Sequence, residues 1–229
     1  MIQSVTGDRR FTVPLFTIDE AAHHLGLPRT TLKDWTHRQA GPAPLVHRIV
    51  NPKAPRAASL PFVAVIEAHV LRGFRDLGLS AQGLRQSVAN LRENLNDEYA
   101  LATRKVATDG VDLLVDMSQH GQPAEWTRAV DTQMAIREVI QDYLQFVYWE
   151  TDRYAKRLRL KTYQGADVII DPRFAFGQPV LERQKIRIED ILDAFWAGEG
   201  YVTIANEFGV KADEVEAVVR SATRPRAAA

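Results

Sequence analysis

The sequence contains no cysteine among its 229 residues. That absence excludes disulfide bonds, iron–sulfur clusters, thiol nucleophiles and thiolate-bound zinc, and it is typical of a protein that works in a reducing cytoplasm. Histidine is also scarce. Of the six histidines, His23 and His24 are adjacent, and on a helix they would point about 100° apart, too far to chelate one ion. We therefore expect a cytoplasmic protein with no metal and no cofactor.

Long apolar runs are missing as well. No stretch approaches the 18 or so apolar residues of a membrane span, and the first residues lack the apolar core of a signal peptide. Glycine-rich phosphate loops, Gly-x-Ser-x-Gly and His-Glu-x-x-His are absent too. The acidic pair Glu189 and Asp190 lies at an expected helix start, where the helix dipole explains it. We expect a protein that is not an enzyme and has no membrane partner.

The net charge of zero is unevenly distributed along the chain. Residues 1–60 carry eight basic and four acidic side chains, whereas residues 161–229 carry nine basic and eleven acidic ones. The balance is therefore +4 at the first end and −2 at the other. Any polyanion would be bound by a local patch, and the N-terminal end is the one suited to it.

Residues 17–38, TIDEAAHHLGLPRTTLKDWTHR, have the pattern of a helix-turn-helix. Thr17 and Glu20 have the spacing of a capping box at the start of the first helix. Gly26 permits a tight turn, and a second helix is expected over residues 29–38. Leu32 and Trp35 would point inward from that helix. Two short helices that cross over such a turn are typical of DNA-binding modules.

The outward face of the second helix carries donors for phosphates and base edges. Its members are Arg29, Thr30, Thr31, Lys33, Thr36, His37 and Arg38. Residues 45–50, LVHRIV, alternate like a strand and are followed by a proline-rich loop, so a basic wing with Arg48, Lys53 and Arg56 is expected. A helical hairpin with a solvated polar face is the alternative.

The first part of the chain resembles the MerR-like winged-helix regulators, in the order of its motifs and in the GLSAQGLRQSVANL helix after the wing. The resemblance implies a winged helix-turn-helix domain over residues 1–97, with two helices after the wing that break at residues 77–80. Ser80 would cap the second of them. A MerR-like regulator that responds to a small molecule is the alternative function. Its pocket would be lined by Phe174, Phe176, Phe195, Trp196 and Tyr201.

Residues 98–156 are expected to form a linker or dimerisation segment. A strand pair is predicted over residues 99–117, with its turn at Thr108-Asp109-Gly110, and a long helix from about Trp126 to Tyr154. The apolar stripe of that helix favours either a core position or a homodimer interface. It consists of Ile136, Val139, Ile140, Tyr143, Phe146 and Val147. A homodimer is expected because one short recognition helix reads too few base pairs.

A second helix-turn-helix spacing is present near the C-terminus. A strand ending at Pro172 and an extended piece at residues 179–181 precede a helix from Ile188 to about Gly198. The following helix pair, with Ala205, Gly209 and Val215, repeats the spacing of Ala22, Gly26 and Leu32. Its second helix presents Asp213, Glu214 and Glu216, which would be repelled by phosphates. It is better suited to a basic protein surface or to solvent.

Residues 157–222 resemble a small bacterial domain of unknown function found in VapB-type antitoxins. The matching residues are Ile170-Asp171-Pro172, Gly177, Pro179-Val180, Ile186, Ile191-Leu192, Ala197-Gly198, Ile204-Ala205, Glu207-Phe208 and Val215. The resemblance implies an antitoxin that neutralises a PIN-type ribonuclease and represses its own operon. One departure is that Arg183 and Lys185 stand where relatives often have glycine and arginine, so a looser turn is expected.

The toxin-binding cations are predicted in two places. An arginine inserted among the acidic residues of a PIN-type ribonuclease would pair with their carboxylates. The first candidates are Arg224 and Arg226 in the tail, residues 223–229, which is otherwise read as a flexible end with solvated charges. The second are Arg183, Lys185 and Arg187 in the turn. The expected fold class is mainly α with short β-hairpins, an α+β protein with operator DNA and the toxin as partners.

Overall fold

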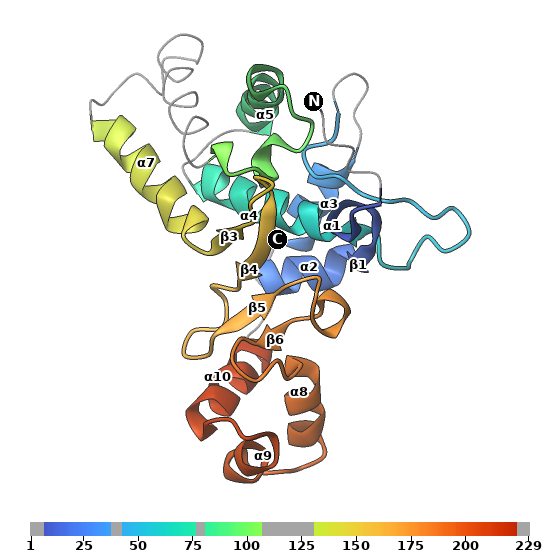
Figure 1. The fold of residues 1–229 in the computed structure, drawn as a ribbon, viewed down its shortest axis with the longest axis vertical. Coiled ribbons are helices and arrows are strands. Elements are labelled where there is room, and N and C mark those ends of the chain that lie inside the picture. Colours follow the sequence, from blue (N-terminus) through green and yellow to red (C-terminus); the bar gives the residue numbers. More distant parts are fainter. Residues whose placement is uncertain (1–6, 38–42, 77–80, 107–130, 224–229) are drawn as a thin grey trace.

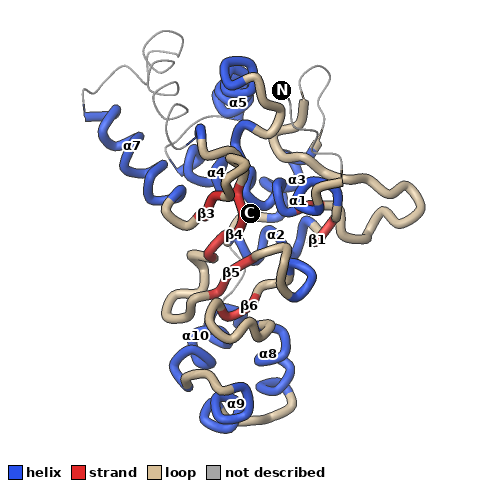
Figure 2. Tube along the Cα trace, viewed as in Figure 1, coloured by secondary structure: helices blue, strands red, loops and turns tan. Residues whose placement is uncertain are grey.

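A computed structural model describes residues 7–37, 43–76, 81–106 and 131–223, without the side chains of residues 131–137. The fold is α+β, as predicted (Figures 1 and 2). The helices are α1 (Arg9–Thr12), α2 (Ile18–Leu25), α3 (Arg29–Thr36), α4 (Phe62–Asp76), α5 (Ala81–Leu95), α7 (Asp131–Leu144), α8 (Ile188–Trp196), α9 (Tyr201–Phe208) and α10 (Ala212–Thr223). The strands are β1 (Pro14–Phe16), β2 (Leu60–Pro61), β3 (Val147–Trp149), β4 (Ala155–Arg159), β5 (Val168–Ile170) and β6 (Val180–Leu181). None of the described helices is both long and apolar enough for a membrane span.

Helix α4 forms the centre of the core. Twelve of its fifteen residues are buried, so the helix is enclosed on all sides rather than amphipathic. Helix α7 packs on it at Gly73, where an added Cβ would lie 2.9 Å from Cδ2 of Tyr143. The two helices therefore approach closely because position 73 has no side chain. Residues 77–80, where a break between α4 and α5 and the capping Ser80 are expected, lie outside the described residues.

The N-terminal module contains the predicted helix-turn-helix. Thr17 and Glu20 form the capping box of α2, with the Thr17 N–H donating to the Glu20 carboxylate at 2.8 Å. Gly26 ends α2 in the left-handed conformation, with φ 63°. Glycine is required here twice over, because a Cβ would also meet Arg72 and Thr162 at 3.0 and 3.1 Å. The small antiparallel pair of β1 and β2 closes the module.

A buried carboxylate, Glu67, joins three parts of this module. Its side chain is fully buried in α4, and it accepts hydrogen bonds from the backbone N–H and Nδ1 of His47, at 2.9 and 2.7 Å. Arg92 of α5 lies 3.6 Å from the same carboxylate and donates to the carbonyls of Pro44 and Leu45. Burial lowers the pKa of the His47 imidazole, but Glu67 outweighs it, so the pKa is raised.

The strand predicted at residues 45–50 is not formed. The backbone N–H of Val46 donates to the Trp35 carbonyl at 3.0 Å, and that of His47 donates to Glu67. These donors are therefore not available for a strand ladder. The wing is instead a long loop, closed where the Ile49 N–H donates to the Ser59 carbonyl at 2.8 Å. It projects from the side of the N-terminal module (Figure 1).

The predicted secondary structure of the middle segment is confirmed for the helix over residues 131–144 and wrong at residues 100–102 and 147–149. Residues 100–102 form a 3-10 helix instead of a strand, and residues 107–130, including the predicted turn, lie outside the described part. The long helix ends at Leu144, and Val147–Trp149 is a strand that pairs with β4. Branched and aromatic residues at 147–149 favour a strand. Pairing with β4 stabilises this strand in place of the helix that the apolar spacing predicted.

An antiparallel sheet in the order β3-β4-β5-β6 connects the two ends of the molecule. The domain boundary expected at residues 156–157 falls inside β4, so the middle segment and the C-terminal part share this sheet. Helices α8, α9 and α10 form a cluster beyond β6, at the lower end in Figure 1. The second helix-turn-helix is confirmed there, with Gly209 at φ 65° matching Gly26 at φ 63°.

Buried His69 of α4 gives a testable pH dependence. Burial lowers its pKa to about 4, aided by the charges of Arg72 and Lys161 and opposed by the hydrogen bond from Nε2 to the Tyr143 carbonyl. The folded pKa lies below the ordinary value, so the unfolded chain binds more protons as the pH falls. The contribution of His69 to stability is therefore full above about pH 6.5 and is lost toward pH 4.

We expect the free energy of unfolding to fall by about 1 kcal/mol more between about pH 7 and 5.5 in the native protein than in His69→Gln. Glutamine keeps a donor for the Tyr143 carbonyl but does not titrate. Urea titrations of both proteins at the two pH values measure the difference. Equal pH dependence in the two proteins would contradict the assignment of a neutral, buried imidazole.

Candidate functional site

The outward face of α3 is a row of hydrogen-bond donors at the protein surface. Arg29, Thr30, Lys33 and His37 are exposed, and Thr31 is half-buried. Thr36 does not belong to this face, because it is buried on the same side of the helix as Leu32 and Trp35, and its hydroxyl donates to the Lys33 carbonyl at 2.8 Å. Arg38 lies outside the described residues.

The cations of this face differ in how they are held. Arg29 forms an ion pair with Asp19 of α2, which fixes its position between the two helices. Lys33 forms no ion pair or hydrogen bond through its side-chain ammonium with any described residue. Thr31 accepts from Arg75 at 3.2 Å. Lys33 is therefore the charge that is free to meet a phosphate, and Arg29 would exchange an existing partner.

The wing loop carries further cations of the same module. Lys53 and Arg56 are exposed, whereas Arg48 is half-buried and its Nε has no hydrogen-bond acceptor among the described residues. A buried guanidinium nitrogen without an acceptor carries a desolvation cost. An acceptor from a bound partner would remove that cost. The residues of the predicted site are thus divided between one helix face and one loop of the same module.

The second helix-turn-helix has the same backbone geometry with the opposite charge. On α10, Asp213 and Glu216 are exposed, and Arg220 lies 3.3 Å from Glu216. Glu214 is half-buried and accepts from the Lys211 N–H at 3.0 Å, so it caps the helix. Carboxylates on the equivalent face would repel the phosphates that α3 is suited to attract.

The turn with the predicted toxin-binding cations is tighter than expected. The Lys185 N–H donates to the Leu181 carbonyl at 2.9 Å, and Lys185 adopts φ 61°. Its ammonium donates to the Glu182 carbonyl and lies 4.9 Å from the centre of the Phe174 ring. Arg187 pairs with Glu189 and Asp190. Only Arg183 of this set is exposed without a partner among the described residues, and Arg224 and Arg226 lie outside them.

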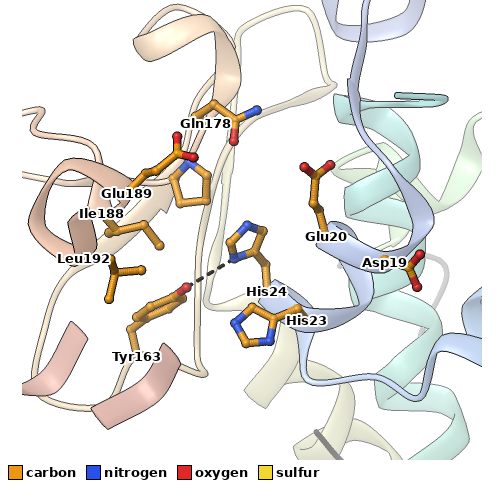
Figure 3. Close-up of a pocket in the computed structure, with 10 residues that line it drawn as sticks. Asp19, Glu20, His23, His24, Tyr163, Gln178, Ile188, Glu189 and Leu192 are labelled. Carbon is orange, nitrogen blue, oxygen red and sulfur yellow. Dashed lines mark hydrogen bonds between the residues drawn. The ribbon is translucent and has the colours of Figure 1, made fainter. Parts of the chain in front are cut away.

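A pocket of about 260 Å³ lies between α2 and the C-terminal cluster (Figure 3). His24 forms one wall, and its Nδ1 lies 3.2 Å from the Tyr163 hydroxyl. Burial, together with the neighbouring His23, lowers the pKa of His24 to about 3, so both partners are neutral near pH 7. Glu20 and Glu189 face the pocket from opposite sides. The histidine–tyrosine contact was not predicted, because residues 24 and 163 are far apart in the sequence.

The aromatic residues assigned to a sensor pocket do not line this one. Phe176 and Trp196 are 84% and 63% exposed, and Tyr201 is 37% exposed. The pocket is lined instead by acidic, histidine and aliphatic side chains. In the stripe predicted to lie either in the core or at a dimer interface, Ile140, Tyr143 and Val147 are buried within the chain itself. Val139 and Phe146 are half-buried, and the side chain of Ile136 is outside the described part.

Comparison with known proteins agrees with these two modules. Residues 14–88 match the family described as "Putative DNA-binding HTH domain", and residues 168–220 match "Protein of unknown function (DUF433)". The structure is similar to the crystal structure of Rv2018 from Mycobacterium tuberculosis, with a TM-score of 0.78 and 31% identity. That similarity covers 92% of this chain and 99% of the other.

The sequence is 34% identical over 223 residues to "Putative antitoxin VapB45" of Mycobacterium tuberculosis. The alignment covers 90% of this chain and 92% of that protein. The protein therefore carries an N-terminal helix-turn-helix DNA-binding domain, and it belongs to the VapB antitoxin family.

Proposed function

We propose that the protein is the antitoxin of a two-component operon, which it represses through α3 and the wing while its C-terminal half neutralises a PIN-type ribonuclease. The observation that carries the DNA-binding part is the exposed donor face of α3, where Lys33 has no acidic partner among the described residues. The exposed cations Lys53 and Arg56 of the wing loop add positive charge to the same module. Counterion release from the contacted phosphates supplies the affinity.

The division between the two halves of the chain follows from charge. The basic N-terminal module is suited to DNA, and the acidic face of α10 is not. A protein partner is therefore assigned to the C-terminal half. The antitoxin family to which the chain belongs supports a toxin as that partner.

The DNA-binding part is tested by reversing two charges on α3. In the double variant Arg29→Glu and Lys33→Glu, attraction to phosphate becomes repulsion, and we expect affinity for the DNA upstream of its own gene to fall by about 100-fold or more. Gel shifts at several salt concentrations also report the slope against salt, which should become shallower by about 0.9 per lost phosphate contact. The matched control is Arg183→Glu, an exposed cation outside this module, which should bind DNA normally.

Circular dichroism is needed on the double variant, because Arg29→Glu also places two carboxylates together at Asp19. If the folded double variant shifts DNA like the native protein, the assignment of α3 as the recognition helix is wrong.

The same double variant separates the two proposed activities in the full chain. Co-expressed with the ribonuclease of its operon, it should restore bacterial growth as well as the native protein does, because α3 is not assigned to the toxin. Repression of a reporter driven by the operon promoter should be lost in the same cells. Loss of growth rescue with normal protein levels would show that the toxin contacts the N-terminal module.

A homodimer remains our expectation for the DNA-bound state. The reason is the length of α3, which reads too few base pairs alone for operator specificity. The surface that forms this dimer is not assigned, because three residues of the predicted stripe, Ile140, Tyr143 and Val147, are buried within the chain. Light scattering of the complex with a DNA fragment should give two chains per operator. A single chain per saturated operator would contradict the expectation.

A further inference from the structure

The end of the C-terminal cluster carries exposed apolar side chains. Trp196, at the end of α8, is 63% exposed, and Val202, in the first turn of α9, is 66% exposed. The Phe195 ring packs against Trp196 at a centroid distance of 5.1 Å and stacks on Tyr201 at 5.6 Å. These residues surround the loop between α8 and α9, and we call this surface the α8–α9 tip. It lies at the lower end of the molecule in Figure 1.

A tryptophan held out in water is costly unless another surface covers it. Fully burying a large apolar side chain is worth about 1.5–3 kcal/mol, and tryptophan and tyrosine are the residues most often found to dominate interface energies. The described part of the chain does not bury Trp196 or Val202. A contiguous exposed group of this kind marks a surface that binds a partner.

The charge around the tip is of one sign. Residues 188–210 contain five acidic side chains and no lysine or arginine. Arg187, just outside this range, pairs with Glu189 and Asp190. The remaining acids are Asp193, Glu199 and Glu207, and they form no ion pair with any described residue.

Glu199 provides a second, independent observation. It lies in the loop between Trp196 and Tyr201, and its Oε2 is buried but accepts no hydrogen bond from the described residues. A buried carboxylate oxygen without a donor costs free energy in the free protein. A cationic side chain arriving from a partner would supply the missing donor.

We propose that the α8–α9 tip is the surface that holds the ribonuclease, with Trp196 inserted into an apolar recess and a lysine or arginine of the ribonuclease bound to Glu199. The inference rests on the proposed function and names the surface that performs its second part. An enzyme that binds RNA presents cations on its substrate face, and the acidic tip is complementary to such a face. The protein thus contacts the ribonuclease through acidic and aromatic side chains, and not through the arginines predicted in the turn and the tail.

Two other occupants fit the tip less well. Nucleic acid would be repelled by the five carboxylates, even though a tryptophan is able to stack on a base. A second copy of this chain would bring two acidic tips together, which places like charges at the contact. Charge complementarity therefore favours a basic protein over both.

The test measures binding of the purified full-length chain to the PIN-type ribonuclease encoded in the same operon. Trp196→Ala should weaken binding by roughly 30-fold or more, as for an interface anchor. Phe176→Ala is the matched control, because Phe176 is another highly exposed aromatic of the C-terminal part and lies outside the tip; it should leave binding unchanged. Glu199→Gln should weaken binding by about 10-fold and reduce its dependence on salt.

Each outcome decides one point. If the native protein binds the ribonuclease and Trp196→Ala binds equally tightly, the tip is not the docking surface, while the proposed function stands. If the native protein does not bind the ribonuclease, both the proposed function and the proposed role of the tip are wrong. If Trp196→Ala changes only the oligomeric state in light scattering, the tip is a self-association surface and the proposal is overturned. Unchanged circular dichroism and thermal unfolding of Trp196→Ala show that the variant is folded.

Discussion

The carboxylate of Glu67 is the interaction on which the N-terminal module depends. A charged group in the centre of the core helix is stable only when its oxygens are paired, and here they meet His47 and lie close to Arg92. The consequence reaches the surface, because His47 begins the wing and Arg92 holds the carbonyls that precede it. The position of the wing loop is therefore determined by a polar contact deep in the protein.

Much of this fold was readable from the sequence where local signals and tertiary packing agree. The capping box at Thr17 and the turns at Gly26 and Gly209 depend on a few neighbouring residues, and the structure has all three. The strand predicted at residues 45–50 failed for the opposite reason. Its backbone donors bind Trp35 and Glu67, which no local pattern reports. The predicted long helix is present but ends at Leu144 rather than at residue 154, because sheet pairing with β4 outweighs helical periodicity at Val147.

The candidate sites also depend on contacts that local sequence patterns do not report. The residue types on α3 predicted a donor face, but helix geometry buries Thr36 beside Leu32, and an ion pair occupies Arg29. In the C-terminal half, the turn cations were assigned to a partner, yet Arg187 pairs with acids of its own helix. The aromatics were expected around a pocket, and Trp196 is exposed instead. Side-chain direction, which decides between these roles, depends on packing between segments distant in the sequence.

The end of α2 has a consequence for how separable the two modules are. Its last carbonyls are held from outside the helix-turn-helix, since the Thr162 hydroxyl donates to the His24 carbonyl at 2.7 Å and Arg72 donates to that of Leu25. Thr162 belongs to the segment that links β4 and β5. A chimera that joined this DNA-binding module to a different C-terminal domain would leave the His24 carbonyl without its donor, next to the turn that aims α3. The two halves are thus a matched pair, and an exchange of one alone would have to rebuild that contact.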